Sequence, residues 1–274
     1  MVVFPNAKIN LGLDIIGKRE DGFHNLETIF YPIQIKDALE IIQTEKPEEI
    51  IFTSSGNEMR GNDTDNLCVK AFRLIKKDFP QIPHIKMHLH KHIPMGAGMG
   101  GGSSDASAVL LLLNKLFDLN ISTEKLNEYA LQLGSDCPFF ITNKPCFASG
   151  RGEQLRAMEI DLSNYKILIV HPAIHLNTAL AFQGLNQSNF SLPGELQSDI
   201  LRDISTWQAT VKNDFEHSVF KQFPEIEGIK NKLYEAGAIY SSMSGSGSGV
   251  FGIFSKDSNA ENIKFPSHYF CLLV

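Results

Sequence analysis

Hydrophobic and polar residues alternate near the start of the chain. In residues 7–14 apolar side chains occupy every second position, which predicts a half-buried strand with Lys8 and Asn10 on one face. Residues 17–22 are charged and contain two glycines, which predicts a turn, and residues 23–35 return to a strand-forming pattern. The chain therefore opens with a hairpin or meander.

The middle of the chain carries helix and strand patterns in turn. The patterns predict a helix capped by Asp65 or Asn66, an alternating strand at residues 85–90, a largely apolar helix at residues 103–117, and a helix that begins after Ser122 and ends at Gly134. The first of these helices has one apolar stripe, and its lysines and arginine are expected to face water.

A second region of strands and helices occupies the remaining chain. It has predicted strands at residues 167–170 and 250–254 and predicted helices near Thr178, Phe215 and Ile226. The polar residues 183–198 predict a long surface loop. We place a boundary near residue 155, so that residues 1–155 form an N-terminal lobe and residues 156–274 a C-terminal lobe.

Composition narrows the class of protein. The chain has 274 residues, of which 43% are hydrophobic, as expected of a globular protein with sizeable cores. Its net charge of -6, without a basic block, argues against nucleic-acid binding. Four widely spaced cysteines predict neither a disulfide framework nor a zinc site, which favours a reducing cytoplasm. The N-terminal residues lack the pattern of a signal or transit peptide, so we expect no export. The longest near-continuous apolar run, residues 108–113 extended to 117, is broken by Asn114 and Lys115 and is too short to cross a membrane.

A glycine-rich segment joins the predicted strand at residues 85–90 to the predicted helix at residues 103–117. Its sequence, Pro94-Met-Gly-Ala-Gly-Met-Gly-Gly-Gly-Ser-Ser104, contains five glycines. Backbone N–H groups and the positive end of the helix converge there, and glycine lets the backbone approach an anion closely. A plain turn is the alternative, but five glycines between two patterned elements cost much backbone entropy. The segment therefore predicts a polyphosphate-binding loop.

Two familiar phosphate loops do not fit this segment. No lysine follows the glycines, as the G-x-x-x-x-G-K-[ST] loop requires. Gly96, Gly98 and Gly101 satisfy G-x-G-x-x-G, but a dinucleotide-binding fold needs a strand ending in an acid after the helix. A second helix is predicted there instead, which leaves the dinucleotide fold as the weaker interpretation.

Asp136 and Lys8 are the candidate catalytic groups. Asp136 lies among apolar residues that limit its solvation, which favours a functional partner, and capping of a helix or turn is the alternative. Lys8 lies mid-strand between apolar residues, and an edge-strand cation facing water is its alternative. As a pair, the lysine would orient the carboxylate and offset charge on a transferred phosphoryl group. Together with the loop they predict an ATP-dependent kinase that phosphorylates a hydroxyl group of a small substrate.

A second segment of small residues lies at 241–249. Its sequence, Ser241-Ser-Met-Ser-Gly-Ser-Gly-Ser-Gly249, has the composition of a flexible linker, but strand-like residues flank it on both sides. A folded loop is therefore favoured, and we hypothesise that it packs against the glycine-rich segment and closes the site.

Three segments together resemble the GHMP kinase superfamily. They are Pro5-Asn-Ala-Lys-Ile-Asn-Leu11, residues 94–104 and residues 243–251, and their order and spacing match as well. The resemblance implies a two-lobed GHMP kinase fold, with an α/β, ribosomal-protein-S5-domain-2-like N-terminal lobe and an α+β, ferredoxin-like C-terminal lobe. It also implies ATP as phosphoryl donor with Mg2+. No carboxylate ligand for the metal stands out, and Ser104 is the candidate.

Two further segments resemble one branch of this superfamily. They are Gly17-Lys-Arg-Glu-Asp-Gly-Phe-His-Asn-Leu-Glu-Thr28 and Leu133-Gly-Ser-Asp-Cys-Pro-Phe139. The match covers nearly the whole chain. It implies phosphorylation of the 2-hydroxyl on the methylerythritol part of a cytidine diphosphate derivative, in the non-mevalonate isoprenoid pathway, with Asp136 as base and Lys8 as its partner.

The same resemblance implies roles for other side chains. Asn10 would hold the polyol, His24 would recognise the cytosine edge, and Phe23 and Phe182 would stack on the ring. Phe23 stands where tyrosine is common in the family, so stacking is kept and a hydroxyl contact is lost. The implied substrate-binding residues are Asn10, Phe23, His24, Asp136, Thr178 and Phe182. The implied ATP-binding residues are Asn66, Leu67, Lys91, Pro94, Met95, Gly96, Ala97, Gly98, Met99, Gly100, Gly101, Gly102, Ser103 and Ser104.

Simpler interpretations of these residues stay open. His24 can be a turn histidine, Phe182 an ordinary core residue, and Lys91 a solvated flank. Rival functions are a GHMP kinase acting on mevalonate, homoserine or a sugar, none of which offers a base to stack, and a non-catalytic nucleotide-binding module or a dinucleotide oxidoreductase. The expected partners are ATP and the small-molecule substrate, with no nucleic acid and no membrane, and we expect a cytoplasmic monomer or weak homodimer.

Overall fold

The computed structural model describes the whole chain except residues 58–61, 63–64, 177–180 and 183–189. The described residues form two compact units. The first contains Met1–Ala7, Gln34–Met95 and Gly100–Lys144, and the second contains Lys8–Ile33, Gly96–Met99 and Pro145–Val274. The chain passes from one unit to the other at several positions, none of which is residue 155. The division into residues 1–155 and 156–274 stays a prediction.

A mixed sheet forms one side of the first unit. Its strands follow the order β1 (Val2–Val3), β4 (Ala38–Gln43), β6 (Ile85–Lys91) and β5 (Ile50–Gly56). β4 is antiparallel to both its neighbours, and β5 is parallel to β6. In β6, Ile85, Met87 and Leu89 are buried, which confirms the alternating strand predicted at residues 85–90. β4 and β5 were not predicted.

Helices complete the first unit, and their ends follow from local chemistry. They are α1 (Leu67–Asp78), α2 (Gly101–Leu116), α3 (Thr123–Leu133) and α4 (Cys137–Thr142). The side chain of Asn66 accepts a hydrogen bond from the Cys68 N–H at 2.8 Å and caps α1, while Ser122 caps α3. The three predicted helices are confirmed, and α2 begins two residues earlier than expected. No helix in the described part of the chain has the length and apolar character needed to cross a bilayer.

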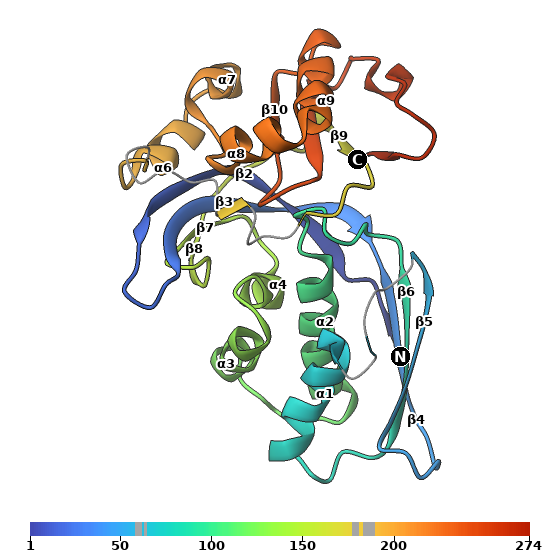
Figure 1. The fold of residues 1–274 in the computed structure, drawn as a ribbon. Helices are drawn as coiled ribbons and strands as arrows, with labels where there is room; N and C mark the ends of the chain where they lie inside the picture. Colours follow the sequence, from blue (N-terminus) through green and yellow to red (C-terminus); the bar gives the residue numbers. More distant parts are fainter. Residues whose placement is uncertain (58–61, 63–64, 177–180, 183–189) are drawn as a thin grey trace. The chain divides into compact units, whose positions relative to one another are not determined.

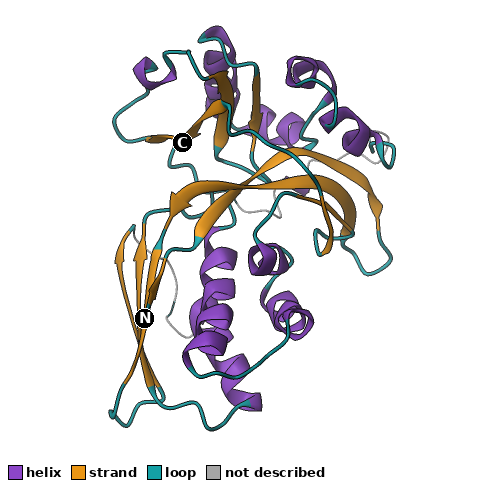
Figure 2. Ribbon diagram, turned by 180° about the vertical axis from the view of Figure 1, so that it is seen from behind, coloured by secondary structure: helices purple, strands orange, loops and turns teal. Residues whose placement is uncertain are grey.

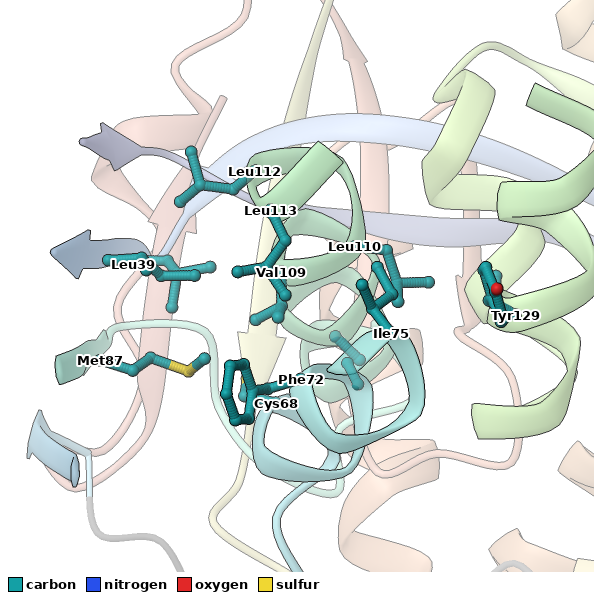
Figure 3. Close-up of a cluster of buried hydrophobic side chains, with 14 of the residues drawn as sticks. Leu39, Cys68, Phe72, Ile75, Met87, Val109, Leu110, Leu112, Leu113 and Tyr129 are labelled. Carbon is teal, nitrogen blue, oxygen red and sulfur yellow. The ribbon is translucent and has the colours of Figure 1, made fainter. Parts of the chain in front are cut away.

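The core of the first unit lies between its sheet and its helices. Figure 3 shows Leu39 of β4 and Met87 of β6 directed toward Phe72 of α1 and Val109 of α2. These side chains are almost fully buried. Since α2 carries apolar residues around most of its circumference, it packs on α1, α3 and α4 as well as on the sheet. This burial fixes α2, and therefore the point at which the glycine-rich loop ends.

The opening hairpin is confirmed and belongs largely to the second unit. β2 (Asn6–Lys18) and β3 (His24–Lys36) are the two long curved strands in Figure 2. They continue into a sheet of order β2-β3-β7-β8, with β7 at Cys146–Ser149 and β8 at Gln154–Ala157. Only residues 6–7 at the start of β2 and residues 34–36 at the end of β3 belong to the first unit.

The second sheet of this unit has the ferredoxin-like strand order. Its strands follow the order β10 (Tyr240–Met243), β11 (Val250–Ser255), β9 (Tyr165–His171) and β12 (Phe270–Leu273), all antiparallel. Helices α8 (Phe215–Gln222) and α9 (Pro224–Glu235) lie between β9 and β10 in the chain (Figure 1). Between β11 and β12 the structure has a short 3-10 turn, Ala260–Asn262, where a ferredoxin-like fold has its second helix.

The remaining segments show where the prediction was incomplete. Helix α6 (Glu195–Ile200) contradicts part of the surface loop predicted at residues 183–198, because Glu195 begins a helix that buries Leu196 and Ile200. A 3-10 turn at Ile204–Thr206 and helix α7 (Trp207–Thr210) follow. The helix predicted near Thr178 lies outside the described residues, whereas the helices predicted near Phe215 and Ile226 are confirmed as α8 and α9.

Candidate active site

Lys8 is a buried cation on β2. Its side chain is 3% exposed, and its ammonium donates to Asn10 Oδ1 at 2.5 Å and to the carbonyl of Gly98 at 3.1 Å. The ring of Phe30 lies 4.9 Å from the ammonium, in cation–π geometry. An edge-strand lysine facing water is therefore the wrong interpretation. The strand alternation correctly predicted that Lys8 and Asn10 share a face.

Asn10 connects distant segments of the second unit. Its amide donates to Thr28 Oγ1 at 2.9 Å, and its backbone N–H donates to Ser244 Oγ at 3.2 Å. The Ser244 hydroxyl in turn donates to the carbonyl of Gly98 at 2.9 Å. Strand β2, the glycine-rich loop and the segment at residues 244–249, which we call the serine-rich loop, therefore meet at one buried point.

The packing of the serine-rich loop on the glycine-rich loop is confirmed. Gly249 N–H donates to the Ala97 carbonyl at 3.2 Å, and Ser248 N–H donates to the Gly96 carbonyl at 3.3 Å. A Cβ atom on Gly98 would lie 1.8 Å from the Ser244 carbonyl oxygen, so only glycine fits there. The loop is shorter than the predicted segment at residues 241–249. Ser241 and Ser242 are buried in strand β10, and the loop itself spans residues 244–249.

The carbonyl groups of residues 96–99 are all used by the protein. The carbonyls of Gly96, Ala97 and Gly98 accept the bonds just described, and that of Met99 accepts from the Lys8 N–H at 3.0 Å. Carbonyl dipoles that are satisfied by protein donors do not repel a bound anion from the opposite side of the peptide groups. The carbonyls of this half of the loop are therefore paired with protein donors, and phosphate binding by its N–H groups stays a prediction.

The other half of the loop leads into α2 in the first unit. Gly100 has a left-handed φ of 67°, and α2 begins at the next residue. Leu67, the first residue of α1, lies 3.9 Å from the position of a Cβ atom on Gly102. Leu67 and the cap residue Asn66 therefore lie beside the start of α2, and their place on the adenosine side stays a prediction.

Asp136 lies in a turn beside the first turns of α2. It occupies the N-cap position of α4 and is half-buried, but its side chain makes no capping hydrogen bond to that helix. The Ser107 hydroxyl of α2 donates to the Cys137 carbonyl at 2.8 Å and holds this turn in place. Asp136 belongs to the first unit and Lys8 to the second, so their pairing stays a prediction.

Cys137, next to Asp136, is chemically quiet. It is fully buried, and that burial raises the pKa of its thiol to about 11. Since the thiolate is the reactive form of cysteine, the side chain has little nucleophilic character at neutral pH.

Two of the implied base-binding residues, His24 and Phe182, contact each other in the second unit. The His24 ring stacks on Phe182 with centroids 4.9 Å apart, and Phe182 packs edge-on against Phe215. Burial lowers the pKa of His24, with a further contribution from Lys18, which favours the neutral imidazole. Phe23 is 54% exposed and lies under the guanidinium of Arg151 at 5.0 Å. Thr178 lies outside the described residues.

Lys91 is not the solvated residue that the sequence allowed. It is 3% exposed, and its ammonium contacts Asp37 and Asp105. Neither carboxylate was singled out in the sequence. Asp105 could have been recognised from the sequence, because an acid that follows two serines at the start of an apolar helix is unusual. The residues around Asp37 gave no such indication. A contact of Lys91 with nucleotide stays a prediction.

Another buried acid lies on β2 beyond Asn10. Burial raises the pKa of Asp14 to about 7, with further contributions from the nearby carboxylates of Asp214 and Glu27. Asp14 is 7% exposed and is therefore largely protonated in mildly acidic solution. Among the described residues, no group of three or more histidine, cysteine or acidic side chains is arranged to hold a metal ion.

Comparisons with known proteins show which proteins this chain is similar to. The family model for the GHMP kinases N terminal domain matches residues 66–144, and the model for the GHMP kinases C terminal domain matches residues 181–265. A 4-diphosphocytidyl-2-C-methyl-D-erythritol kinase of Bacteroides fragilis (strain YCH46) is 47% identical over 270 residues, which cover 98% of this chain and 97% of that protein.

Solved structures show the same likeness. The crystal structure of a 4-(cytidine 5'-diphospho)-2C-methyl-D-erythritol kinase matches with a TM-score of 0.80 and 30% identity, over 92% of this chain and 90% of that chain. A mevalonate kinase of Methanococcus jannaschii matches with a TM-score of 0.71 at 14% identity, over 99% and 97% of the two chains. The second likeness concerns the fold alone.

Proposed function

Since the chain belongs to the GHMP kinase family, and within it to the 4-diphosphocytidyl-2-C-methyl-D-erythritol kinases, we propose that it transfers the terminal phosphoryl group of ATP to the 2-hydroxyl of 4-diphosphocytidyl-2-C-methyl-D-erythritol. The products are the 2-phosphate and ADP, in the non-mevalonate route to isoprenoid precursors. The observation that carries the proposal is the meeting of Lys8, Asn10, Gly98 and Ser244 at one buried point.

ATP places its phosphates along residues 94–104 in this proposal. The glycines allow the backbone to approach phosphate oxygens, and the positive end of α2, which is 16 residues long, adds its dipole. The adenosine lies on the side of Asn66 and Leu67. Mg2+ would accompany the nucleotide and offset the charge of its phosphates, with the Ser104 hydroxyl as the candidate protein ligand.

Asp136 orients the attacking hydroxyl and receives its proton. An alcohol with a pKa near ~15.7 and an aspartate near ~3.9 differ by about 12 units, or roughly 16 kcal/mol for complete proton transfer. The carboxylate therefore does not ionise the alcohol in advance. In a loose transition state the bond from the γ-phosphorus to the leaving oxygen of ADP breaks early, a bond to the substrate's 2-oxygen forms, and the proton passes to Asp136 late.

Lys8 offsets negative charge near the transferred group. Its ammonium is buried and is held in place by Asn10 and Gly98, so it needs little reorganisation during the reaction. In this proposal Asn10 contacts the polyol beside the reacting hydroxyl. On the substrate side, Phe23 and Phe182 provide stacking faces for cytosine and His24 recognises its edge.

The substrate is tested by measuring ADP release with three alcohols. We expect turnover with 4-diphosphocytidyl-2-C-methyl-D-erythritol and none with mevalonate or homoserine, because neither of the latter has a base to stack on Phe23 and Phe182. Turnover with mevalonate or homoserine but not with the cytidine diphosphate substrate would overturn the assignment.

The roles of the two charged residues are tested by substitution. We expect Asp136→Asn and Lys8→Ala to abolish phosphoryl transfer while ATP still binds, measured by ADP release and by calorimetric titration. Lys125→Ala is the control, since Lys125 is an exposed lysine that pairs with Glu128 on the surface of α3. Unchanged turnover in both test variants would refute the mechanism.

A further inference from the structure

Three buried charged residues in the first unit form what we call the loop-base triad, namely Lys91, Asp37 and Asp105. Lys91 ends β6, Asp37 lies between β3 and β4, and Asp105 lies in the second turn of α2. Their exposed fractions are 3%, 1% and 2%. The Lys91 ammonium contacts Asp37 Oδ2 and donates to Asp105 Oδ2 at 2.7 Å.

The triad lies where the two arms of the glycine-rich loop come together. A Cβ atom on Gly101, in the arm that enters α2, would lie 2.9 Å from Ile93 Cγ2 and 3.3 Å from the Lys91 ammonium. Ile93 belongs to the arm that leaves β6. Residues 93 and 101 therefore approach each other closely at the base of the loop, and the Lys91 ammonium lies beside the point where they approach.

Each arm is attached to a different carboxylate. Asp37 Oδ1 accepts the backbone N–H groups of His92 at 2.6 Å and Ile93 at 2.8 Å, which fixes the arm that leaves β6. Asp105 belongs to the helix that the other arm enters. Because Lys91 contacts both carboxylates, it joins the two arms through charge-assisted hydrogen bonds.

The end of β6 is also held from its other side. The Asn57 N–H donates to the Lys91 carbonyl at 2.8 Å, and the Asn57 side-chain amide donates to the His92 carbonyl at 2.8 Å. The ammonium therefore projects from a backbone segment that is fixed on both sides. Any change in its contacts is expected to reach the loop, because β6 has little freedom to adjust.

Stability alone is a poor explanation for this arrangement. Burying one ammonium and two carboxylates carries a desolvation cost, and apolar residues of similar volume often serve stability as well or better. Within the described part of the chain, Asp105 Oδ1 is buried without a hydrogen-bond partner. What the triad provides is direction, since hydrogen-bonded charges fix an orientation that apolar contacts do not.

We propose that the loop-base triad is a positioning device that sets the separation of the two loop arms and thereby aims the loop's backbone N–H groups at the nucleotide's phosphates. Lys91 acts through the loop and does not need to touch the nucleotide. This inference rests on the proposed function, because it takes the loop to be the site that binds ATP. It assigns to Asp37 and Asp105 a role in nucleotide affinity.

The test uses Asp105→Ala, which cuts the link to α2, and Asp105→Asn, whose amide oxygen still accepts from Lys91. We expect Asp105→Ala to weaken ADP binding and raise the KM for ATP by about ten- to hundredfold, while the KM for the alcohol substrate stays unchanged. Amide hydrogen exchange should become faster in residues 94–104 and not in α3. Asp105→Asn should change the same quantities in the same direction but less.

Asp78→Ala is the control variant, and three results would overturn the proposal. Asp78→Ala removes another carboxylate of the first unit, one that the Tyr129 hydroxyl contacts at 2.5 Å, far along α1 from the loop, and should leave ADP affinity unchanged. Wild-type ADP affinity in Asp105→Ala, an equal rise of both KM values, or an equal loss in Asp78→Ala overturns the proposal.

Hydrogen exchange still decides the test if Asp105→Ala does not fold or if the wild-type protein binds no ADP. If Asp105→Ala does not fold, Asp105→Asn decides, because faster exchange confined to residues 94–104 supports the positioning role and wild-type rates overturn it. If the wild-type protein binds no ADP, the proposed kinase function fails, and the exchange rates of the ligand-free variants still decide whether the triad holds the loop.

Discussion

Gly98→Ala is the substitution for which the structure gives the sharpest expectation. Gly98 has a φ of 70°, in the left-handed region, and the Cβ atom of alanine would lie 1.8 Å from the Ser244 carbonyl oxygen. Even close contacts between carbon and carbonyl oxygen keep about 3.3 Å between the atoms, so one backbone must move by roughly 1.5 Å. The left-handed conformation alone costs an alanine about 1–2 kcal/mol.

The consequence for catalysis follows from the size of this displacement. A shift of about 1 Å in a group that positions the substrate can cost about a hundredfold in rate. We therefore expect kcat/KM for ATP to fall by about a hundredfold, equivalent to about 2.7 kcal/mol. The Gly98 carbonyl also accepts from Lys8 and Ser244, so the displacement disturbs the proposed catalytic lysine as well.

The assay is steady-state ADP release together with thermal unfolding, and Gly228→Ala is the control. Gly228 lies in α9 of the same unit, and no atom lies within 4 Å of the position of its Cβ atom. Alanine there should stabilise the protein by about 0.5–1 kcal/mol and leave turnover unchanged. If Gly98→Ala keeps kcat/KM within about threefold of the wild-type value, the packing of the two loops does not position the phosphates.

Two other predictions concern the second unit. The pKa of Asp14 is raised to about 7 in the fold, so the protonated form is favoured, and its contribution to stability is complete below about pH 4 and lost as the pH rises to about 7. The free energy of unfolding of Asp14→Asn, measured in urea, should therefore equal that of the wild type at pH 4 and exceed it at pH 8 by up to about 4 kcal/mol. A gain of the same size at both pH values would contradict this expectation. Phe23→Ala should raise the KM for the cytidine diphosphate substrate about tenfold while Phe23→Tyr does not, since stacking on a base contributes about 1–3 kcal/mol, and equal KM values in initial-rate measurements would exclude stacking at Phe23.

Local patterns predicted much of what surrounds the loops. The period of two in β2 correctly placed Lys8 and Asn10 on one face, and the order of strand, glycines and apolar helix correctly placed the glycine-rich loop between β6 and α2. Asn66 was one of two predicted caps because its side chain can accept a backbone N–H, and it is the one used. Such features depend on neighbours in the sequence, which is why one chain was enough to find them.

Long-range contacts were predicted far less well. Asp37 and Lys91 are 54 positions apart, and nothing in either local sequence indicates that they meet. Strands β4 and β5 were missed because each is short or carries exposed polar residues, and their positions depend on pairing with β6. The contact of Ser244 with Gly98 was expected only as a hypothesis, based on the small residues that both loops share.

The most direct measurement is a crystal structure with a non-hydrolysable ATP analogue and the cytidine diphosphate substrate. We expect the triphosphate to lie against the backbone N–H groups of residues 96–104. We also expect the acceptor hydroxyl to lie within hydrogen-bond reach, about 2.6–3.2 Å, of an Asp136 carboxylate oxygen. A triphosphate bound elsewhere, or an Asp136 side chain directed away from the hydroxyl, would contradict it.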